Sequence, residues 1–388
     1  MAIKKWTLTD VINRIYCDEL TIGPETLKGK ATGCAVTKRR LRGGLSDGVD
    51  VVRITGGEFS FDVVPTRGMS LWKAWLGELE IGWRSPVRGP VHPYFVPLME
   101  SGGLGWLDGF DELLVRCGLE SNGAPDFDEH GILRYPLHGR IGNRPAHYVE
   151  VAIDDETGEI ALTGVVEETR FHFLKLRMTS TVTIRAGEPG LRIHDRVENL
   201  SASAAEIQML YHVNFGEPLL EAGSRCIAPV KTVVPRTPRA AAGIANWDSY
   251  EAAVAGYEEQ VYFLELLAEN DGATRTMLKN ARGDLGVSLS FNIQQLPWFT
   301  LWKNTTAAAD GCATGLEPGT NFPNPRSYEG QQGRVVRLAP FGEVGFDLGL
   351  EFHTGVAQVG RAEAAIAALQ NGVQPTVYDQ PQEGWCAL

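Results

Sequence analysis

The chain has 388 residues and a net charge of −12, with 36 lysines and arginines against 48 aspartates and glutamates. An acidic protein repels phosphate backbones, and the densest basic cluster, Lys38–Arg40 with Arg42, is short, so we expect no nucleic-acid partner. No run of about 20 apolar residues predicts a membrane span. Six scattered cysteines without a C-x-x-C pair argue against a zinc ribbon or a disulfide framework, and we expect a cytoplasmic protein.

The first third of the chain predicts few long elements. Residues 7–16 predict a short helix capped by Thr9 or Asp10. Residues 50–64 predict two strands joined by a hairpin turn at Gly56-Gly57. Residues 84–131 lack periodicity but are rich in glycine, proline and aromatic residues, which is typical of a functional loop. We therefore expect this segment to wrap a site.

Alternation of apolar and polar residues is strongest from 147 to 215. Within 206–215 it places Ile207 and Met209 on one face of a strand and Gln208, His212 and Asn214 on the other. Further strands are predicted at 261–267, 274–279, 286–293, 298–303, 334–338 and 344–353, and a helix at 361–371 that Gly372 ends.

We find no internal repeat and no low-complexity linker. Successive strands with few helices predict an all-β, mainly antiparallel fold in one domain spanning residues 1–388. Within that domain, residues 1–45 would form an N-terminal extension. Residues 361–388 would form a C-terminal helix and tail packed on the rest.

Motifs for phosphoryl transfer, hydride transfer and serine hydrolysis are absent from the sequence. Three other stretches carry proton-transfer groups: Leu137–Arg140 contains His138, Tyr211–Asn214 contains His212, and Gly315–Asn321 contains Glu317. An imidazole can give a proton and a carboxylate can take one, which is the pairing that opening a sugar hemiacetal ring requires. Gly139 permits close approach to the backbone beside His138. Pro318 keeps Glu317 extended, and the surrounding turn residues predict a loop at a strand end.

These three stretches resemble the three active-site motifs of the aldose 1-epimerase (galactose mutarotase-like) superfamily, and they follow one another along the chain in the same order as in that superfamily. Further runs resemble its DUF4432 branch: Pro65–Met69, Gly105–Phe110, Cys117–Leu119 and His138–Ile141. The resemblance covers about residues 50–350. It implies a β-supersandwich with a few short helices and a sugar site in a cleft of one curved sheet.

The resemblance also implies roles for the three residues. His212 would protonate the ring oxygen, Glu317 would take the proton of the anomeric hydroxyl, and His138 would hydrogen-bond the ring or C1 oxygens. We expect these side chains to converge on one cavity, with the acid and the base several ångströms apart and room for a ring between them. No cofactor and no metal are needed.

Five more residues are assigned to substrate binding: Arg67, Arg140, Gln208, Asn214 and Asn321. Arg67 and Arg140 stand beside Gly68 and Gly139 in runs typical of the branch, and we expect both to point into the cleft. Arg140 itself departs from the usual motif. The aspartate with which many mutarotases hold sugar hydroxyls has no counterpart around 240–260.

The leading hypothesis is a carbohydrate anomerase acting on a small-molecule sugar or sugar derivative. One alternative is a non-catalytic carbohydrate-binding protein on the same scaffold. Another is a metal-dependent sugar isomerase or epimerase in which His138, His212 and Glu317 form a two-histidine, one-carboxylate set. The identity of the sugar, its charge and the oligomeric state are left open.

Overall fold

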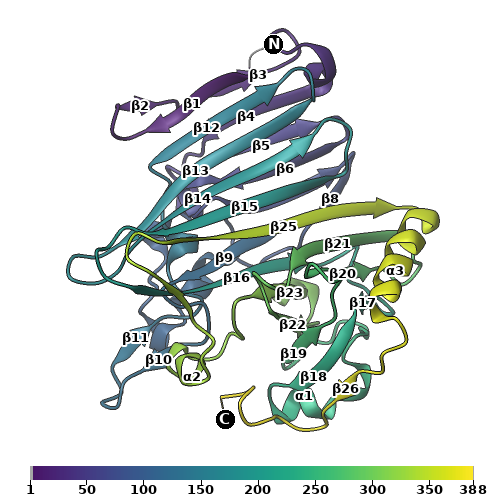
Figure 1. The fold of residues 1–388 in the computed structure, drawn as a ribbon. Helices are drawn as coiled ribbons and strands as arrows, with labels where there is room; N and C mark the ends of the chain where they lie inside the picture. Colours follow the sequence, from purple (N-terminus) through teal and green to yellow (C-terminus); the bar gives the residue numbers. More distant parts are fainter. Residues whose placement is uncertain (1–2, 388) are drawn as a thin grey trace.

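A computed structural model describes residues 3–387, and it consists mainly of two large antiparallel sheets packed on each other (Figure 1). The only parallel pairing among the named strands of residues 3–387 joins β18 (Val230–Pro235) to β26 (Thr376–Val377). The expected all-β, mainly antiparallel supersandwich is confirmed.

Ten strands form the first sheet, in the order β17 (Arg225–Ile227), β20 (Ala273–Lys279), β21 (Leu285–Asn292), β25 (Glu343–Thr354), β15 (Gly190–Asn199), β14 (Lys175–Arg185), β13 (Glu159–Thr169), β12 (Tyr148–Asp154), β1 (Lys4–Asp10) and β2 (Ile15–Tyr16). Fourteen strands form the second, in the order β26, β18, β19 (Gln260–Leu266), β22 (Trp298–Asn304), β23 (Ala313–Gly319), β16 (Ala205–Phe215), β9 (Leu114–Leu119), β7 (Ser70–Leu76), β6 (Phe59–Val64), β5 (Asp50–Gly56), β4 (Cys34–Arg40) and β3 (Leu20–Ile22), with β24 (Val336–Leu338) beside β16 and β8 (Leu79–Ile81) beside β7. A separate hairpin joins β10 (Asp126–Phe127) to β11 (Leu133–Tyr135).

The core lies between the two large sheets and is built by alternation. In β16, Ile207 and Met209 point into it, as the sequence pattern predicted. Leu210 points the other way, into a smaller cluster on the outer face of the fourteen-stranded sheet that includes Trp106 and Phe110. Both aromatics come from residues 84–131, so this segment covers the outer face of β16, where the functional loop was expected.

The short helix predicted over residues 7–16 is wrong. Residues 4–10 form β1, which pairs with β12, and residues 15–16 form β2. Burial of Leu8 between the sheets and the pairing of β1 with β12 outweigh the local helix signal, because the pairing satisfies the backbone of β1. Residues 20–22 and 34–40 extend the edge of the other sheet as β3 and β4.

The C-terminal helix α3 (Val356–Gln370) starts five residues earlier than predicted and ends at Asn371, which has a left-handed backbone. Its buried face packs on Met277 of the ten-stranded sheet through Val359, Ala362 and Ile366. The chain then returns along the fourteen-stranded sheet, where β26 pairs with β18 and the C-terminal end meets Phe322. These contacts support our proposal of one cooperative domain, although residues 1, 2 and 388 of its stated range lie outside the described residues.

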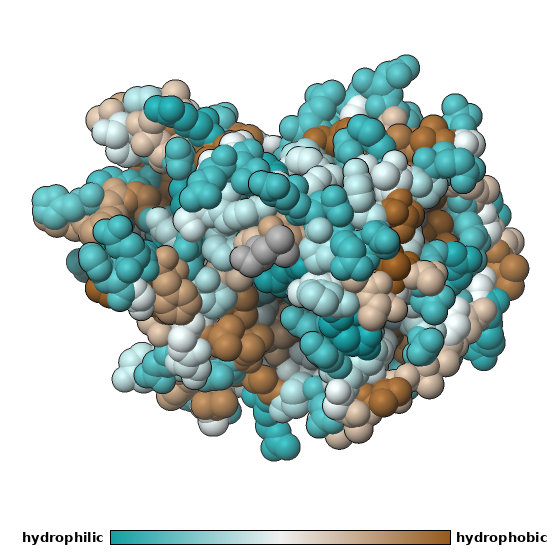
Figure 2. Space-filling model, turned by 90° about the horizontal axis from the view of Figure 1, so that it is seen from below, coloured by the Kyte–Doolittle hydropathy of each residue, from teal (hydrophilic) through white to brown (hydrophobic). Residues whose placement is uncertain are grey.

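Two further helices are short: α1 (Pro238–Ala242) and α2 (Arg326–Gln331). Within the part of the chain that the structure describes, no helix is both long and apolar enough to cross a bilayer. The face seen from below in Figure 2 is mostly hydrophilic, with hydrophobic residues in small separate patches, as expected for a chain with a charge of −12.

Candidate active site

Three neighbouring strands of the fourteen-stranded sheet form the floor of the site. In the antiparallel pair of β16 and β23, Val213 lies opposite Leu316, so the register places His212 opposite Glu317. On the other side of β23, Thr300 of β22 lies opposite Glu317. Residues directly opposite one another share a sheet face, so the three side chains form a row on the outer face. Glu317 thus belongs to a strand, and the prediction that it sits in a loop is wrong.

His212 and Glu317 are in direct contact. Glu317 Oε1 lies 3.2 Å from His212 Nε2, and both side chains are almost fully buried. The expected separation with room for a sugar ring between them is wrong. The reason is chemical: the two oxygens of a hemiacetal are bonded to the same carbon, so an acid and a base that serve them must be close neighbours. A sugar would therefore lie over the pair rather than between its members.

Asn214 fixes the tautomer of His212. Its side-chain amide nitrogen donates to the carbonyl oxygens of Glu112 and His212, which turns its Oδ1 toward His212 Nδ1 at 2.5 Å. An amide oxygen can only accept, so the proton of neutral His212 is on Nδ1 and the lone pair on Nε2 faces Glu317. Asn214 is fully buried and does not line the cavity. It positions His212 and is not the substrate contact that we predicted.

The buried surroundings disfavour the charged forms of both residues of this pair. Burial raises the pKa of the Glu317 carboxyl well above its ordinary value, and the Glu259 carboxylate adds to this against the opposing effect of Arg236. Burial, together with neighbouring His138, lowers the pKa of the His212 imidazole well below its ordinary value. Both shifts favour the neutral form of the pair, in which the ionisable proton is on Glu317 and the lone pair of His212 Nε2 faces it.

His138 approaches the same place from a tight turn. Its Nδ1 lies 2.9 Å from the carbonyl oxygen of Asn122, which can only accept, so neutral His138 also carries its proton on Nδ1. Burial lowers the pKa of His138 to about 4, with the Arg236 guanidinium acting in the same direction. A Cβ on Gly139 would lie 2.0 Å from the carbonyl oxygen of Ser121, so the close approach expected there is made by the main chain.

Gln208 and Asn321 act behind His138. Gln208 Oε1 accepts from the backbone nitrogen of Asn122, and Asn321 exchanges two side-chain hydrogen bonds with Asn122. Both residues are buried and neither lines the cavity. Their prediction as substrate contacts is wrong, because Gln208 Oε1 and the Asn321 side-chain amide hold Asn122, whose carbonyl orients His138. Asn122 itself was missed, and no pattern in the sequence marks it.

Arg67 is a structural residue. It is fully buried and donates to Glu112 Oε1 at 2.5 Å, to Asn143 Oδ1 at 2.7 Å and to two backbone carbonyls. The prediction that it points into the cleft is therefore wrong: the side chain is fully buried, and its guanidinium makes four hydrogen bonds to protein atoms. Arg140 does not line the cavity either, and its side chain contacts the sulfur of Met99 at 3.5 Å.

His138, His212 and Glu317 do converge on one cavity of about 280 Å³, as predicted. Three aromatic side chains form part of its walls. The centroid of the Trp106 ring lies 4.6 Å from that of His138, and the centroids of Phe110 and Trp302 lie 5.2 and 5.5 Å from that of His212. The remaining lining residues are Leu104, Leu107, Ala124, Pro125, Leu137, Arg236, Glu259, Val261, Thr300 and Pro323.

Sequence reasoning missed most of these walls. Trp106 and Phe110 stand in the run Gly105–Phe110, whose resemblance to the DUF4432 branch marked the run but gave neither residue a role. Trp302 is opposite Gly315 in the sheet, which only the strand pairing reveals. Arg236 and Glu259 carry no local signal.

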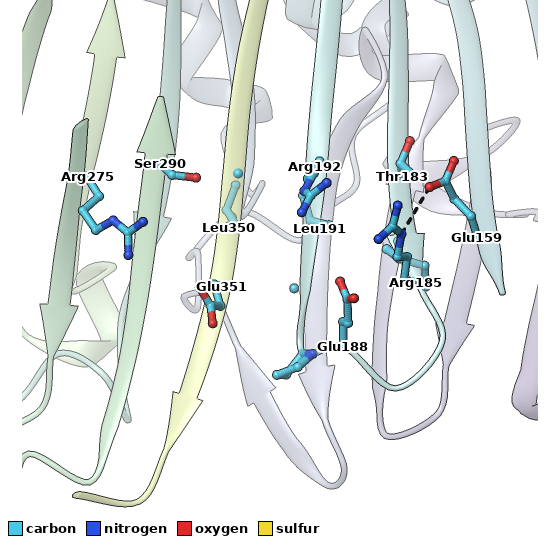
Figure 3. Close-up of a pocket in the computed structure, with 14 residues that line it drawn as sticks. Glu159, Thr183, Arg185, Glu188, Leu191, Arg192, Arg275, Ser290, Leu350 and Glu351 are labelled. Carbon is cyan, nitrogen blue, oxygen red and sulfur yellow. Dashed lines mark hydrogen bonds and ion pairs between the residues drawn. The ribbon is translucent and has the colours of Figure 1, made fainter. Parts of the chain in front are cut away.

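A separate hollow lies on the outer face of the ten-stranded sheet (Figure 3). It is lined by the polar sides of neighbouring strands, with Arg192 and Arg275 among its charged residues and an ion pair of 3.4 Å between Arg185 and Glu159. None of the predicted site residues reaches it. It has the composition of a solvated sheet face, so we place the active site in the aromatic cavity.

The geometry does not favour the metal-dependent alternative. Across residues 3–387, no group of three or more histidine, cysteine, aspartate or glutamate side chains is arranged to hold a metal ion. The ring centroids of His138 and His212 lie 5.2 Å apart, with an angle of 81° between the ring planes.

The fold is that of the galactose mutarotase-like class of β-supersandwiches. The chain belongs to the family described as a domain of unknown function, DUF4432, whose model matches residues 46–352. No protein with a curated description matches it.

Solved structures agree with this assignment. A crystal structure from Klebsiella pneumoniae subsp. pneumoniae, provisionally named an aldose 1-epimerase, is 34% identical over 98% of this chain and 99% of that chain, with a TM-score of 0.95. A galactose mutarotase-like protein from Clostridium acetobutylicum is 15% identical over 82% of this chain and 98% of that chain, with a TM-score of 0.57. An Escherichia coli structure, also provisionally named an aldose 1-epimerase, is 11% identical over 79% of this chain and all of that chain, with a TM-score of 0.51. The two more distant similarities show the fold alone.

Proposed function

We propose that this protein is a carbohydrate anomerase, an isomerase that opens and recloses the hemiacetal ring of a sugar by general acid–base catalysis. One observation carries the proposal: a buried carboxyl and an imidazole of fixed tautomer touch at 3.2 Å on the floor of an aromatic cavity. The name given to the Klebsiella relative points to the same reaction class. Aromatic walls suit the apolar faces of a sugar ring.

The reaction follows from the single proton that the pair holds. When the proton of the pair passes from Glu317 Oε1 to His212 Nε2, Glu317 becomes a carboxylate and His212 an imidazolium. The carboxylate takes the proton of the anomeric hydroxyl while Nε2 gives its proton to the ring oxygen. The bond between C1 and the ring oxygen breaks, and C1 becomes an aldehyde carbon. The pair is then back in its neutral form, with the proton on Glu317.

Ring closure reverses these roles. The aldehyde end rotates, the former ring oxygen attacks the other face of C1, and its proton passes to His212 Nε2 as Glu317 returns a proton to the carbonyl oxygen. Atoms and protons balance without a further reactant. Positioned proton transfer of this kind contributes a rate factor on the order of 10² to 10⁴.

His138 has a narrower role than the resemblance implied. The proton of neutral His138 is on Nδ1 and is held by Asn122, so Nε2 carries a lone pair. Nε2 can accept a hydrogen bond from a sugar hydroxyl. It cannot bind the ring oxygen, because neither atom carries a proton to donate. We therefore assign His138 to a hydroxyl of the substrate. Because its pKa is about 4, it keeps this role throughout the neutral range.

Two-dimensional NMR exchange spectroscopy on free sugars tests the proposal, because it measures interconversion of anomers at equilibrium. A protein that binds a sugar without accelerating its exchange would be the non-catalytic carbohydrate-binding alternative. Acceleration that disappears with a chelator and returns with added metal would favour the metal-dependent alternative.

A further inference from the structure

Arg236 is a cation of the cavity that the proposed reaction does not use. It follows β18, and its backbone nitrogen donates to Val261 of β19 at 2.9 Å, so its position is fixed by the sheet. It lines the cavity together with His138 and Glu317. Its charge acts on both, since it lowers the pKa of His138 and opposes the rise in the pKa of Glu317. Arg236 therefore lines the cavity close to the two residues, His138 and Glu317, that a substrate would contact.

The guanidinium of Arg236 has no protein partner. Among residues 3–387, no hydrogen bond or ion pair engages it. The fully buried arginines behave differently: Arg67 is bound by Glu112, and Arg116 by Asp195. Arg334 is likewise bound by Glu329. In a chain with an excess of twelve negative charges, an arginine left unpaired inside a cavity is available for a ligand.

Glu259 lines the same cavity but does not neutralise Arg236. Its Oε2 accepts from the indole nitrogen of Trp302 at 2.7 Å, and no ion pair joins it to Arg236. This arrangement holds the carboxylate against the aromatic wall and leaves the guanidinium free. Glu259 can accept hydrogen bonds from sugar hydroxyls, whereas Arg236 presents a planar fork of donors that matches an oxyanion.

We propose that the substrate is a sugar carrying an oxyanion substituent, a carboxylate or a phosphate, and that Arg236 binds this group. The inference rests on the proposed function for the sugar ring, and it adds the substrate class. Two charge-assisted hydrogen bonds from a guanidinium fork orient the ring over His212 and Glu317. Arg236 would then stand near the region of the chain where the aspartate of many mutarotases has no counterpart.

Binding constants for matched sugar pairs test the inference without relying on catalysis. The pairs are glucuronate and glucose, galacturonate and galactose, and glucose 6-phosphate and glucose, so that the first two report on a carboxylate and the third on a phosphate. Titrations use the full chain as wild type, Arg236→Gln and Arg236→Lys. Arg192→Gln is the control, because it removes one exposed and unpaired charge from the hollow on the ten-stranded sheet (Figure 3).

We expect the wild type to bind the anionic member of at least one pair about 10- to 100-fold more tightly than the neutral member. Arg236→Gln should abolish this preference, Arg236→Lys should keep part of it, and Arg192→Gln should keep it in full. A wild type without preference in any pair, or a preference that survives in Arg236→Gln, would overturn the inference. Anomer exchange is recorded on the same samples: a preference that depends on Arg236 without exchange refutes the proposed function alone, and exchange without preference refutes this inference alone.

Discussion

Glu317 Oε1 lies 3.2 Å from the Nε2 atom of His212, on the opposite side of the imidazole from Asn214, whose Oδ1 lies 2.5 Å from Nδ1. The imidazole is therefore held between Asn214 Oδ1, which only accepts a hydrogen bond, and the Glu317 carboxyl, which can exchange a proton. Cross-strand register brings Glu317 and His212 together. The hydrogen bond to Asn214 keeps the proton on Nδ1, so the lone pair is on Nε2. The pair works as one unit with one proton, and several consequences can be measured.

The first prediction is the pH dependence of anomerisation. Activity requires one proton on the pair. The pKa of Glu317 is raised, so this proton is lost only well above pH 4.5; the pKa of His212 is lowered, so a second proton binds only well below pH 6.5. His138 gains its proton near pH 4. We expect kcat/KM to stay level through pH 6.5 and to fall in acid toward pH 4 and again in alkali. A half-maximal point near pH 6.5 would mean that an ordinary imidazole titrates.

The second prediction concerns Asn214. Asn214→Ala removes the acceptor of the Nδ1 proton, so His212 should populate the other tautomer and the proton should occupy Nε2, where the pair needs a lone pair. Nitrogen NMR shifts of His212 report the tautomer directly. We expect Nδ1–H in the wild type, a shift toward Nε2–H in the variant, and a fall in kcat on the order of 10²-fold with a smaller change in KM. An unchanged His212 spectrum would show that Asn214 does not set the tautomer.

A third prediction uses Gly315, which lies beside the pair. A Cβ at this position would be 2.3 Å from Glu317 Oε1 and 3.2 Å from His212 Cε1, so Gly315→Ala must displace the carboxylate. Misplacing a reacting group by about 1 Å costs on the order of 10²-fold in rate. Gly330→Ala is the matched control, because its Cβ would meet nothing within 4 Å. Equal rates for both variants would mean that the position of Glu317 is unimportant.

The fourth prediction separates the two arginines first assigned to the ligand. Arg67→Ala leaves Glu112 as an unpaired buried charge and should lower the free energy of unfolding by about 3–5 kcal/mol. Arg140→Ala removes a contact with a thioether sulfur and should cost less than about 1 kcal/mol. Denaturant unfolding of both variants measures this. Wild-type stability in Arg67→Ala, combined with lost sugar affinity, would restore the ligand role.

Patterns within single strands were readable from the sequence. Alternation placed His212 on the face opposite Ile207 and Met209, and the structure has it there. The convergence of three distant residues followed from the resemblance together with the chemistry of ring opening. Local patterns failed where tertiary pairing competes with them. Residues 7–10 and 15–16 lie in strands because β1 pairs with β12 and with β2. The turn-forming residues around Glu317 lie inside β23 because strands pair on both its sides.

Partners across long sequence distances could not be predicted. Nothing near Arg67 indicates that Glu112 will neutralise it 45 residues later, and nothing near His138 indicates that Gln208 and Asn321 will hold its carbonyl partner. The same residue type can be a buried structural side chain or a ligand-binding side chain, and the sequence does not distinguish the two. What distinguishes them is whether a protein atom already occupies their hydrogen-bonding directions.

The most direct test of the central claim compares anomer exchange by NMR in the wild type, His212→Ala, Glu317→Gln and the double variant, on a sugar that all four bind. If the pair acts as one unit with one proton, each single variant should lose a factor on the order of 10² to 10⁴ in rate, and the double variant should lose little more than either alone. An undiminished rate in both single variants, or a wild type that binds the sugar and leaves its exchange at the uncatalysed rate, would contradict the account.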